Sequence, residues 1–252
     1  MRARLANPSV VWFAVDGGKR ILQYDSSNGQ VSQVAYMGIR VDTFTPHVGI
    51  REKIYFADAN GNKIYLYLQP SAPGTTSPSI TIVLNHTTYV RCIRFGPDPE
   101  FGFEMYFSEA SGAGGGLIYR IARNLPQTFM RIDPRDFDGY WAGHFEFGRN
   151  DTLYLSSGNR IPSSIYEVRG GRVTKLATFG FPVMGMDYVE NARLERLATP
   201  GGGVTVSRGL LFADHGSRIY LYDLTNGNLY VIFDDGSYGR IVDVAVPPPR
   251  PS

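Results

Sequence analysis

Cysteine, histidine and charge are all scarce in this sequence of 252 residues. The single cysteine, Cys92, has no second cysteine with which to form an internal disulfide. Neither Cys92 nor the four histidines stand at the spacings that hold a structural zinc ion. The 25 basic and 23 acidic residues leave a formal net charge of +2 and form no basic stripe. These shortages exclude a structural zinc site, predict that nucleic acid is not a partner, and leave the redox compartment open.

Long apolar runs are absent as well. No stretch approaches the roughly 18 residues of a membrane helix, and the apolar run at 10–15 is too short for a signal-peptide core. We therefore expect a soluble protein with no membrane partner. Asn85-His-Thr87 and Asn150-Asp-Thr152 match the acceptor pattern for N-glycosylation, so a secreted origin stays open and the localisation is undefined.

Apolar and aromatic residues are plentiful by contrast. They make up 43% and 13% of the chain, which also contains 29 glycines and 16 prolines. A chain of this length can bury about 70–75% of its unfolded surface around one core. The composition therefore predicts one ordered globular unit and excludes a disordered chain.

One short motif occurs five times. Its copies read VWFAVD at 11–16, IYFAD at 54–58, MYFSE at 105–109, LYLSS at 153–157 and LLFAD at 210–214. A second apolar strand follows each copy, at 20–24, 63–67, 117–120, 164–168 and 218–222. Asn28-Gly29 and Asn226-Gly227 then mark hairpin turns in two of the copies. A period of 43 to 57 residues, with several short strands per unit and no helical stretch, is typical of a β-propeller.

A further apolar strand precedes four of the copies, at 41–45, 90–95, 141–147 and 183–188. The first copy lacks one, and the matching strand, 240–246, stands at the other end of the chain. Pairing of 240–246 with the N-terminal strands would close the last blade with both termini and leave no free edge in the ring.

We thus predict an all-β, single-domain β-propeller over residues 1–246, with five blades, followed by a Pro-rich tail at 247–252. Six blades remain an alternative, as does a barrel or sandwich. The segment 191–203 lengthens the last interval between copies, and we interpret it as an excursion between two strands.

The predicted strand order places the start of every inner strand on one face, together with the turns between the second and third strands. That face surrounds the mouth of the central channel, and concave sites with apolar walls and a few polar groups bind small ligands. We expect aromatic walls there, and Arg91 or Arg240 to orient an anion. The predicted ligand-binding residues are Phe44, Tyr89, Arg91, Tyr140, Trp141, Met184, Tyr238 and Arg240.

Four residues are candidates for proton transfer. Asp214 precedes His215, and a histidine beside a carboxylate can act as a general base near neutral pH. His144 and Glu146 share one face of an inner strand, where burial would perturb their pKa values. Glu109 occupies the repeat position that also holds Asp214. The alternatives are structural: acids at that position cap their own turn, and His144 and Glu146 brace neighbouring blades.

Two further motifs are interpreted as turns. Asp58–Asn62 places oxygen donors at alternate positions, as calcium loops do, but Gln69 stands where a bidentate Glu is needed. Gly112–Gly116 is glycine-rich like a phosphate-binding loop, yet it joins two strands and opens no helix. Neither motif adds a metal or a cofactor to the prediction.

Several blade phrases carry a family resemblance. IYFADA at 54–59, MYFSEA at 105–110 and LFADHGSRIYLYD at 211–223 resemble the blades of the gluconolactonase, regucalcin and strictosidine synthase superfamily, and of NHL-repeat propellers. The resemblance spans nearly the whole chain and implies a propeller fold.

The lactonase members imply a metal held by acidic or amide residues at the start of inner strands, typically just before a glycine. Here Ala142 and Met184 precede the two glycines, and Val90 begins another inner strand. Such side chains cannot hold a hard divalent cation, so we predict no metal. Strictosidine synthase is a metal-free relative with an aromatic-walled pocket and one acidic catalytic group, which suits the aromatic residues at this mouth better.

The function expected is binding of a small, partly apolar ligand at the channel mouth, by a binder or by a strictosidine synthase-like enzyme without a cofactor. One alternative is a protein-interaction scaffold that uses the same face for a protein partner. Another is a metal-dependent, lactonase-like hydrolase. A carbohydrate-binding propeller would need near-identical sites in every blade, and the five loops differ. We expect a monomer.

Overall fold

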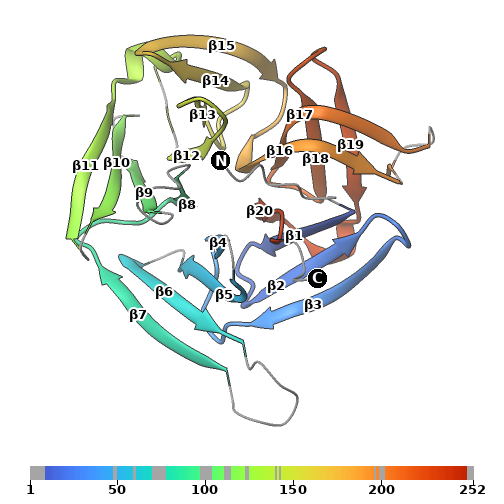
Figure 1. Ribbon diagram of the computed structural model, residues 1–252, viewed down its shortest axis with the longest axis horizontal. Coiled ribbons are helices and arrows are strands. Elements are labelled where there is room, and N and C mark those ends of the chain that lie inside the picture. The colour runs from blue at the N-terminus through green and yellow to red at the C-terminus, as the bar shows by residue number, and fades with distance from the viewer. Residues whose placement is uncertain are drawn as a thin grey trace.

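The computed structural model describes residues 9–47, 50–58, 61–69, 78–96, 104–110, 115–122, 125–139, 141, 143–195, 197–198 and 202–248. Within these residues the chain forms five four-stranded antiparallel sheets around a central axis (Figure 1). The predicted all-β, five-bladed propeller is confirmed. Helical structure in this part of the chain is limited to two short 3-10 turns, η1 (Pro134–Phe137) and η2 (Gly236–Tyr238), and no helix there could span a membrane.

Each blade runs from an inner strand at the axis to an outer strand at the rim. Blade 1 consists of β20 (Ile241–Ala245), β1 (Val10–Val15), β2 (Arg20–Asp25) and β3 (Gln30–Tyr36). Blade 2 consists of β4 (Thr43–His47), β5 (Ile50–Ala57), β6 (Lys63–Leu68) and β7 (Ser79–Asn85). Blade 3 consists of β8 (Cys92–Phe95), β9 (Met105–Ala110), β10 (Gly116–Ala122) and β11 (Leu125–Ile132). Blade 4 consists of β12 (His144–Phe147), β13 (Leu153–Ser156), β14 (Ser163–Arg169) and β15 (Arg172–Phe179). Blade 5 consists of β16 (Met184–Leu194), β17 (Val204–Ala213), β18 (Arg218–Asp223) and β19 (Leu229–Asp234).

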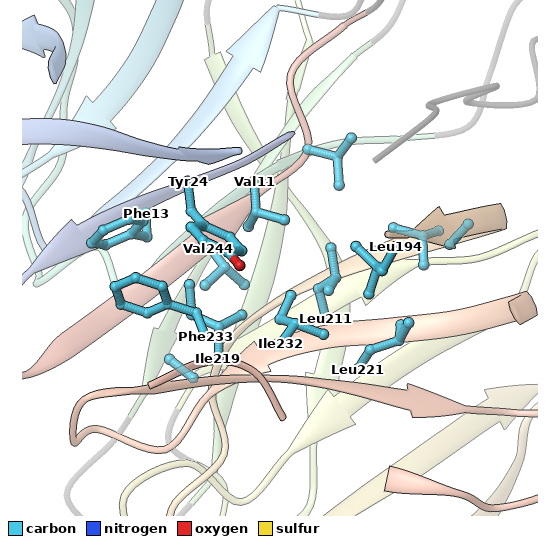
Figure 2. Packing of buried hydrophobic residues seen from close by; sticks show 14 of the residues in the cluster. Val11, Phe13, Tyr24, Leu194, Leu211, Ile219, Leu221, Ile232, Phe233 and Val244 are labelled. Atoms are coloured by element: carbon cyan, nitrogen blue, oxygen red, sulfur yellow. The ribbon is translucent and has the colours of Figure 1, made fainter. Parts of the chain in front are cut away.

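Both ends of the chain contribute to blade 1. Strand β20 pairs antiparallel with β1, and Val244 lies opposite Phe13. The predicted closure by the two termini is therefore confirmed. Figure 2 shows the adjacent seam with blade 5, where Val11 and Phe13 pack with Leu211 and Phe233.

The core is divided into five clusters of buried hydrophobic side chains, one between each pair of neighbouring blades. The central residue of each repeat copy falls in a different cluster, and none is exposed: Phe13, Phe56, Phe107, Leu155 and Phe212. The repeat therefore reflects the need for one large apolar side chain at each interface between blades. Burial of such a side chain contributes about 1.5–3 kcal/mol to the free energy of folding.

The interpretation of 191–203 as an excursion between strands is wrong for 191–194, which belong to β16. Strands β16 and β17 continue as a long hairpin, with Ala192 opposite Val206 and Leu194 opposite Val204. Ala192, Leu194 and Val206 are buried against the seam between blades 1 and 5, which stabilises the extension. This longer hairpin accounts for the wide last interval, and the described residues contain no sixth sheet.

Candidate functional site

The five inner strands surround the axis of the ring (Figure 1). Because each is the inner strand of a blade with the same antiparallel strand order, all five start on the same face. Blades 1 to 3 each contribute the residue just before the inner strand, and blades 4 and 5 contribute the first residue of the strand. We call these five the mouth ring: Arg240 of blade 1, Asp42 of blade 2, Arg91 of blade 3, His144 of blade 4 and Met184 of blade 5.

Below the mouth ring, Arg94 of β8 lies at the axis with its side chain 2% exposed. Its Nη2 lies 2.7 Å from Oδ1 of Asp243 on β20. Its Nε lies 2.9 Å from Oε2 of Glu146 on β12. Burial alone would lower the pKa of Arg94, but the carboxylates, Asp243 first, hold it well above its usual value.

The same guanidinium also donates to three backbone carbonyls. Nε donates to Met186 O of β16 at 2.9 Å, and Nη1 donates to Phe44 O of β4 at 3.1 Å and to Ile93 O at 2.7 Å. One side chain therefore contacts all five inner strands. A buried charge is tolerated when its donors are satisfied in this way.

Glu146 is consequently engaged as a brace between blades. Besides the ion pair with Arg94, its Oε1 accepts the backbone N–H of Phe147 at 2.8 Å. This is the structural alternative considered for Glu146, and its side chain is only 2% exposed.

His144 starts β12 and is 6% exposed. The Nε1–H of Trp141 donates to its backbone carbonyl at 3.1 Å. Burial lowers the pKa of His144 to about 4; nearby Asp243 raises it, while Arg94, Arg91 and His215 lower it further. The imidazole is therefore neutral at pH 7, and it stands within electrostatic range of groups from blades 1, 3 and 5.

Arg91 packs beside the strand of His144. Gly143 has φ +100°, and a Cβ at this position would lie 2.6 Å from Cβ of Arg91. Only glycine leaves the room for that approach. The Arg91 guanidinium stands over the ring of Tyr89, 5.5 Å from its centroid, and Tyr89 is 55% exposed. The structure thus brings the predicted residues Arg91 and His144 together at the mouth.

Asp42 is a mouth residue that the sequence reasoning missed. Its backbone N–H donates to Ala57 O at 3.0 Å, which fixes it just before β4. Burial raises the pKa of its carboxyl, and the charges of Arg91 and Arg40 only partly offset that rise. The available signal was its place directly before an inner strand, which it shares with Arg91.

Glu109 forms a separate polar cluster beside the mouth face. Its Oε2 lies 3.0 Å from Nε2 of His86 and also accepts the hydroxyl of Thr88. Burial would raise the pKa of Glu109, but hydrogen bonds from Thr88, His86 and Tyr119 lower it overall. His86 was not predicted; its only sequence signal was the glycosylation pattern that contains it.

Asp214 caps its own turn. Its Oδ1 accepts the backbone N–H of Gly216 at 2.7 Å and that of Arg218 at 3.2 Å. Asp214 therefore has the structural role that was the alternative to proton transfer. Glu109 differs, because its side chain contacts His86 outside its own turn.

The predicted aromatic walls lie deeper than expected. Phe44 and Trp141 are 0% and 1% exposed, because each packs in a cluster between blades. Tyr238 is half-buried with ring contacts to Phe13 and Phe233. Among the remaining predicted residues, Met184 is half-buried, Arg240 is exposed, and Tyr140 and the end of the tail, 249–252, lie outside the described residues.

Metal-ligating side chains do not cluster in the described residues. No three His, Cys, Asp or Glu side chains among them are grouped so that they could hold a metal ion.

Comparison with known proteins shows similarity of shape and little of sequence. No family model matches the chain. No curated protein matches it either. A chain of the nidogen/laminin complex is 12% identical, with 93% of this chain and 97% of that chain covered and a TM-score of 0.55. The luciferin-regenerating enzyme is 13% identical, with coverages of 94% and 76% and a TM-score of 0.53. Regucalcin from Agrobacterium tumefaciens is 13% identical, with coverages of 87% and 68% and a TM-score of 0.48. At such identities the likeness shows the fold alone, and at that level it confirms the predicted resemblance to known propellers.

Proposed function

We propose that this propeller binds a small, partly apolar molecule at the mouth of its channel. The observation that carries the proposal is the division of the mouth ring. Three consecutive blades supply the charged residues Arg240, Asp42 and Arg91, and the next two supply His144, which is neutral at pH 7, and Met184. A ligand with a polar group at one end and an apolar body matches this arrangement.

The ring also supports proton transfer by side chains. Asp42 is an acidic group whose pKa burial raises, which suits it to proton transfer, and His144, neutral at pH 7, can donate or accept a hydrogen bond. One acidic catalytic group is what the strictosidine synthase-like reading requires. The luciferin-regenerating enzyme, with a similar fold, is by its name an enzyme, which supports chemistry on this scaffold.

A thermal-shift experiment with matched probes tests the binding site. Benzoate, benzylamine and benzyl alcohol share one ring and differ in charge. At a tenfold excess over its Kd, a probe that binds should raise the melting midpoint by about 3–6 °C. The shift should fall in Arg91→Gln and Asp42→Asn and persist in Arg172→Gln, an exposed change on β15. Absence of a shift with all three probes, or equal shifts in all variants, would contradict the proposal.

A protein partner on the same face is the second candidate. Tyr89 and Ile161 are 55% and 62% exposed there, and exposed aromatic and apolar side chains often dominate protein binding. A chain of the nidogen/laminin complex has a similar fold, which supports this alternative. Tyr89→Ala with Ile161→Ser should weaken a protein complex, whereas the probe shifts above should depend on Arg91 and Asp42.

A further inference from the structure

The rim of the propeller consists of five outer strands: β3, β7, β11, β15 and β19. Within the described residues, each of them is hydrogen-bonded to a single neighbouring strand of its sheet. The backbone groups along the other edge pair with no strand of the sheet, and proteins normally protect such edges.

Two outer strands are protected by cover or by charge. On β19, the backbone N–H of Ala198 donates to Val231 O at 2.9 Å, so the chain covers this edge itself. Strand β15 carries the cations Arg172 and Lys175. Both devices oppose the addition of another strand.

Two others are protected less directly. Strand β11 exposes Leu125 and Phe129, but it also contains Pro126, which cannot donate a backbone hydrogen bond, and Arg131. Strand β3 has no charge; its Val31 and Val34 are half-buried and pack against the core, and its exposed apolar side chain, Tyr36, stands at the last position of the strand.

Within the part of the chain that the structure describes, strand β7 has none of these protections. Its sequence, SITIVLN, contains no charge and no proline, and Ile80 and Ile82 are 39% and 52% exposed. An open, uncharged edge with exposed β-branched residues favours pairing with another strand.

We propose that β7 is a docking edge for β7 of a second copy of this chain. Antiparallel pairing about a twofold axis at Thr81 places Ile80 of each copy opposite Ile82 of the other, in the regular part of β7 before its bulge at Val83. The exposed isoleucines then face each other, and no charge enters the ladder. Such a contact is self-complementary and closes at two copies, because each β7 has one open edge.

The distribution of charged residues favours self-pairing at β7 over self-pairing at β15. The same self-pairing at β15 would place two copies of Arg172 and of Lys175 on one short ladder, and like charges across a ladder are destabilising. Like charges therefore oppose strand pairing between two copies at β15, and no such charges oppose it at β7.

Sedimentation velocity from low to high micromolar concentration tests the proposal. The unmodified chain should show a dimer whose fraction rises with concentration. Ile82→Lys should leave a monomer throughout, whereas Thr174→Lys, an exposed change on β15, should behave as the unmodified chain. A monomer at every concentration, as expected from the sequence, would overturn the proposal, and so would a dimer that persists in Ile82→Lys.

Hydrogen exchange supplies an independent readout. Backbone amides in β7 should exchange more slowly at high concentration in the unmodified chain and show no concentration dependence in Ile82→Lys. Slowing confined to another edge would place the contact elsewhere and overturn the assignment to β7.

Discussion

At the scale of single residues, Arg94 places a buried positive charge at the axis of the ring, where loss of hydration makes a charge costly in free energy. Its side chain is 2% exposed and is satisfied by the carboxylates of Asp243 and Glu146 and by three carbonyls. Removing one member of such a buried set leaves the others uncompensated.

Arg94→Met should therefore lower the free energy of unfolding by about 3–5 kcal/mol, measured by urea denaturation. Adding Glu146→Gln and Asp243→Asn to the same chain should recover part of that loss, because the orphaned charges are removed. Arg172→Met, on the exposed end of β15, should change stability by less than about 0.5 kcal/mol. A small loss in Arg94→Met would show that the ion pairs do not join the blades.

His144 makes stability depend on pH. Its pKa is lowered from 6.5 to about 4 in the folded protein, chiefly by burial. Between these values the unfolded chain binds a proton that the folded chain does not, so stability is lost as the pH falls from about 6.5 towards 4. This one group accounts for up to roughly 3 kcal/mol of that loss.

The measurement is urea unfolding at several pH values across that window, for the unmodified protein and for His144→Gln. The variant should lose less stability on acidification, because glutamine does not titrate. Parallel curves for the two proteins would contradict a neutral, buried His144.

At the scale of elements, a bulge in β16 shapes the channel. The pairing of β16 with β17 shifts between Met184 and Met186, and Gly185 between them has φ +48°. A Cβ on Gly185 would lie 2.5 Å from Cα of Asp243. The inner strands of blades 5 and 1 therefore approach each other through this glycine, beside the carboxylate that binds Arg94.

Gly185→Ala should lower the free energy of unfolding by at least about 2 kcal/mol, because both the backbone angle and the contact with Asp243 are strained. Gly180→Ala is the matched control, since an added Cβ there meets nothing within 4 Å. Chemical denaturation of both variants measures the difference. Equal stability of the two would show that β16 can move away from β20.

Element positions could be predicted because each depends on a local pattern. One large buried residue per blade, such as Phe56 or Phe212, repeats at nearly constant spacing, and it revealed the strands, the five blades and the closure by β20. The extension of the hairpin was missed because the charged residues Arg193 and Glu195 made 191–203 resemble a loop. Ala192 and Leu194, which alternate with them, are buried in the core.

The site could be predicted only in part, because its contacts join residues far apart in sequence. Arg94 has its carboxylate partners 52 and 149 positions away, at Glu146 and Asp243, and no local motif records such pairs. Residue type likewise could not show that Phe44 and Trp141 pack between blades.

At the scale of the whole molecule, the ring depends on its last strand. Strand β20 completes blade 1 and supplies Asp243 to the axis. A ring that lacks it loses a seam of the core and a partner of Arg94 at the same time.

Deletion of residues 240–252 should therefore abolish a single cooperative melt and the near-UV circular dichroism signal of packed aromatic side chains. Deletion of residues 249–252 leaves β20 intact and should preserve both signals. A cooperative melt after the longer deletion would mean that four complete blades and an open fifth are stable alone.

We propose that all five blades contribute to one ligand site at the mouth. Chemical-shift mapping tests this, by titration of the uniformly labelled, assigned protein with whichever of the three probes gives the largest thermal shift. We expect the largest perturbations at Asp42, Arg91 and His144, and their loss in Arg91→Gln. Perturbations that instead concentrate at the rim or on the opposite face would contradict it.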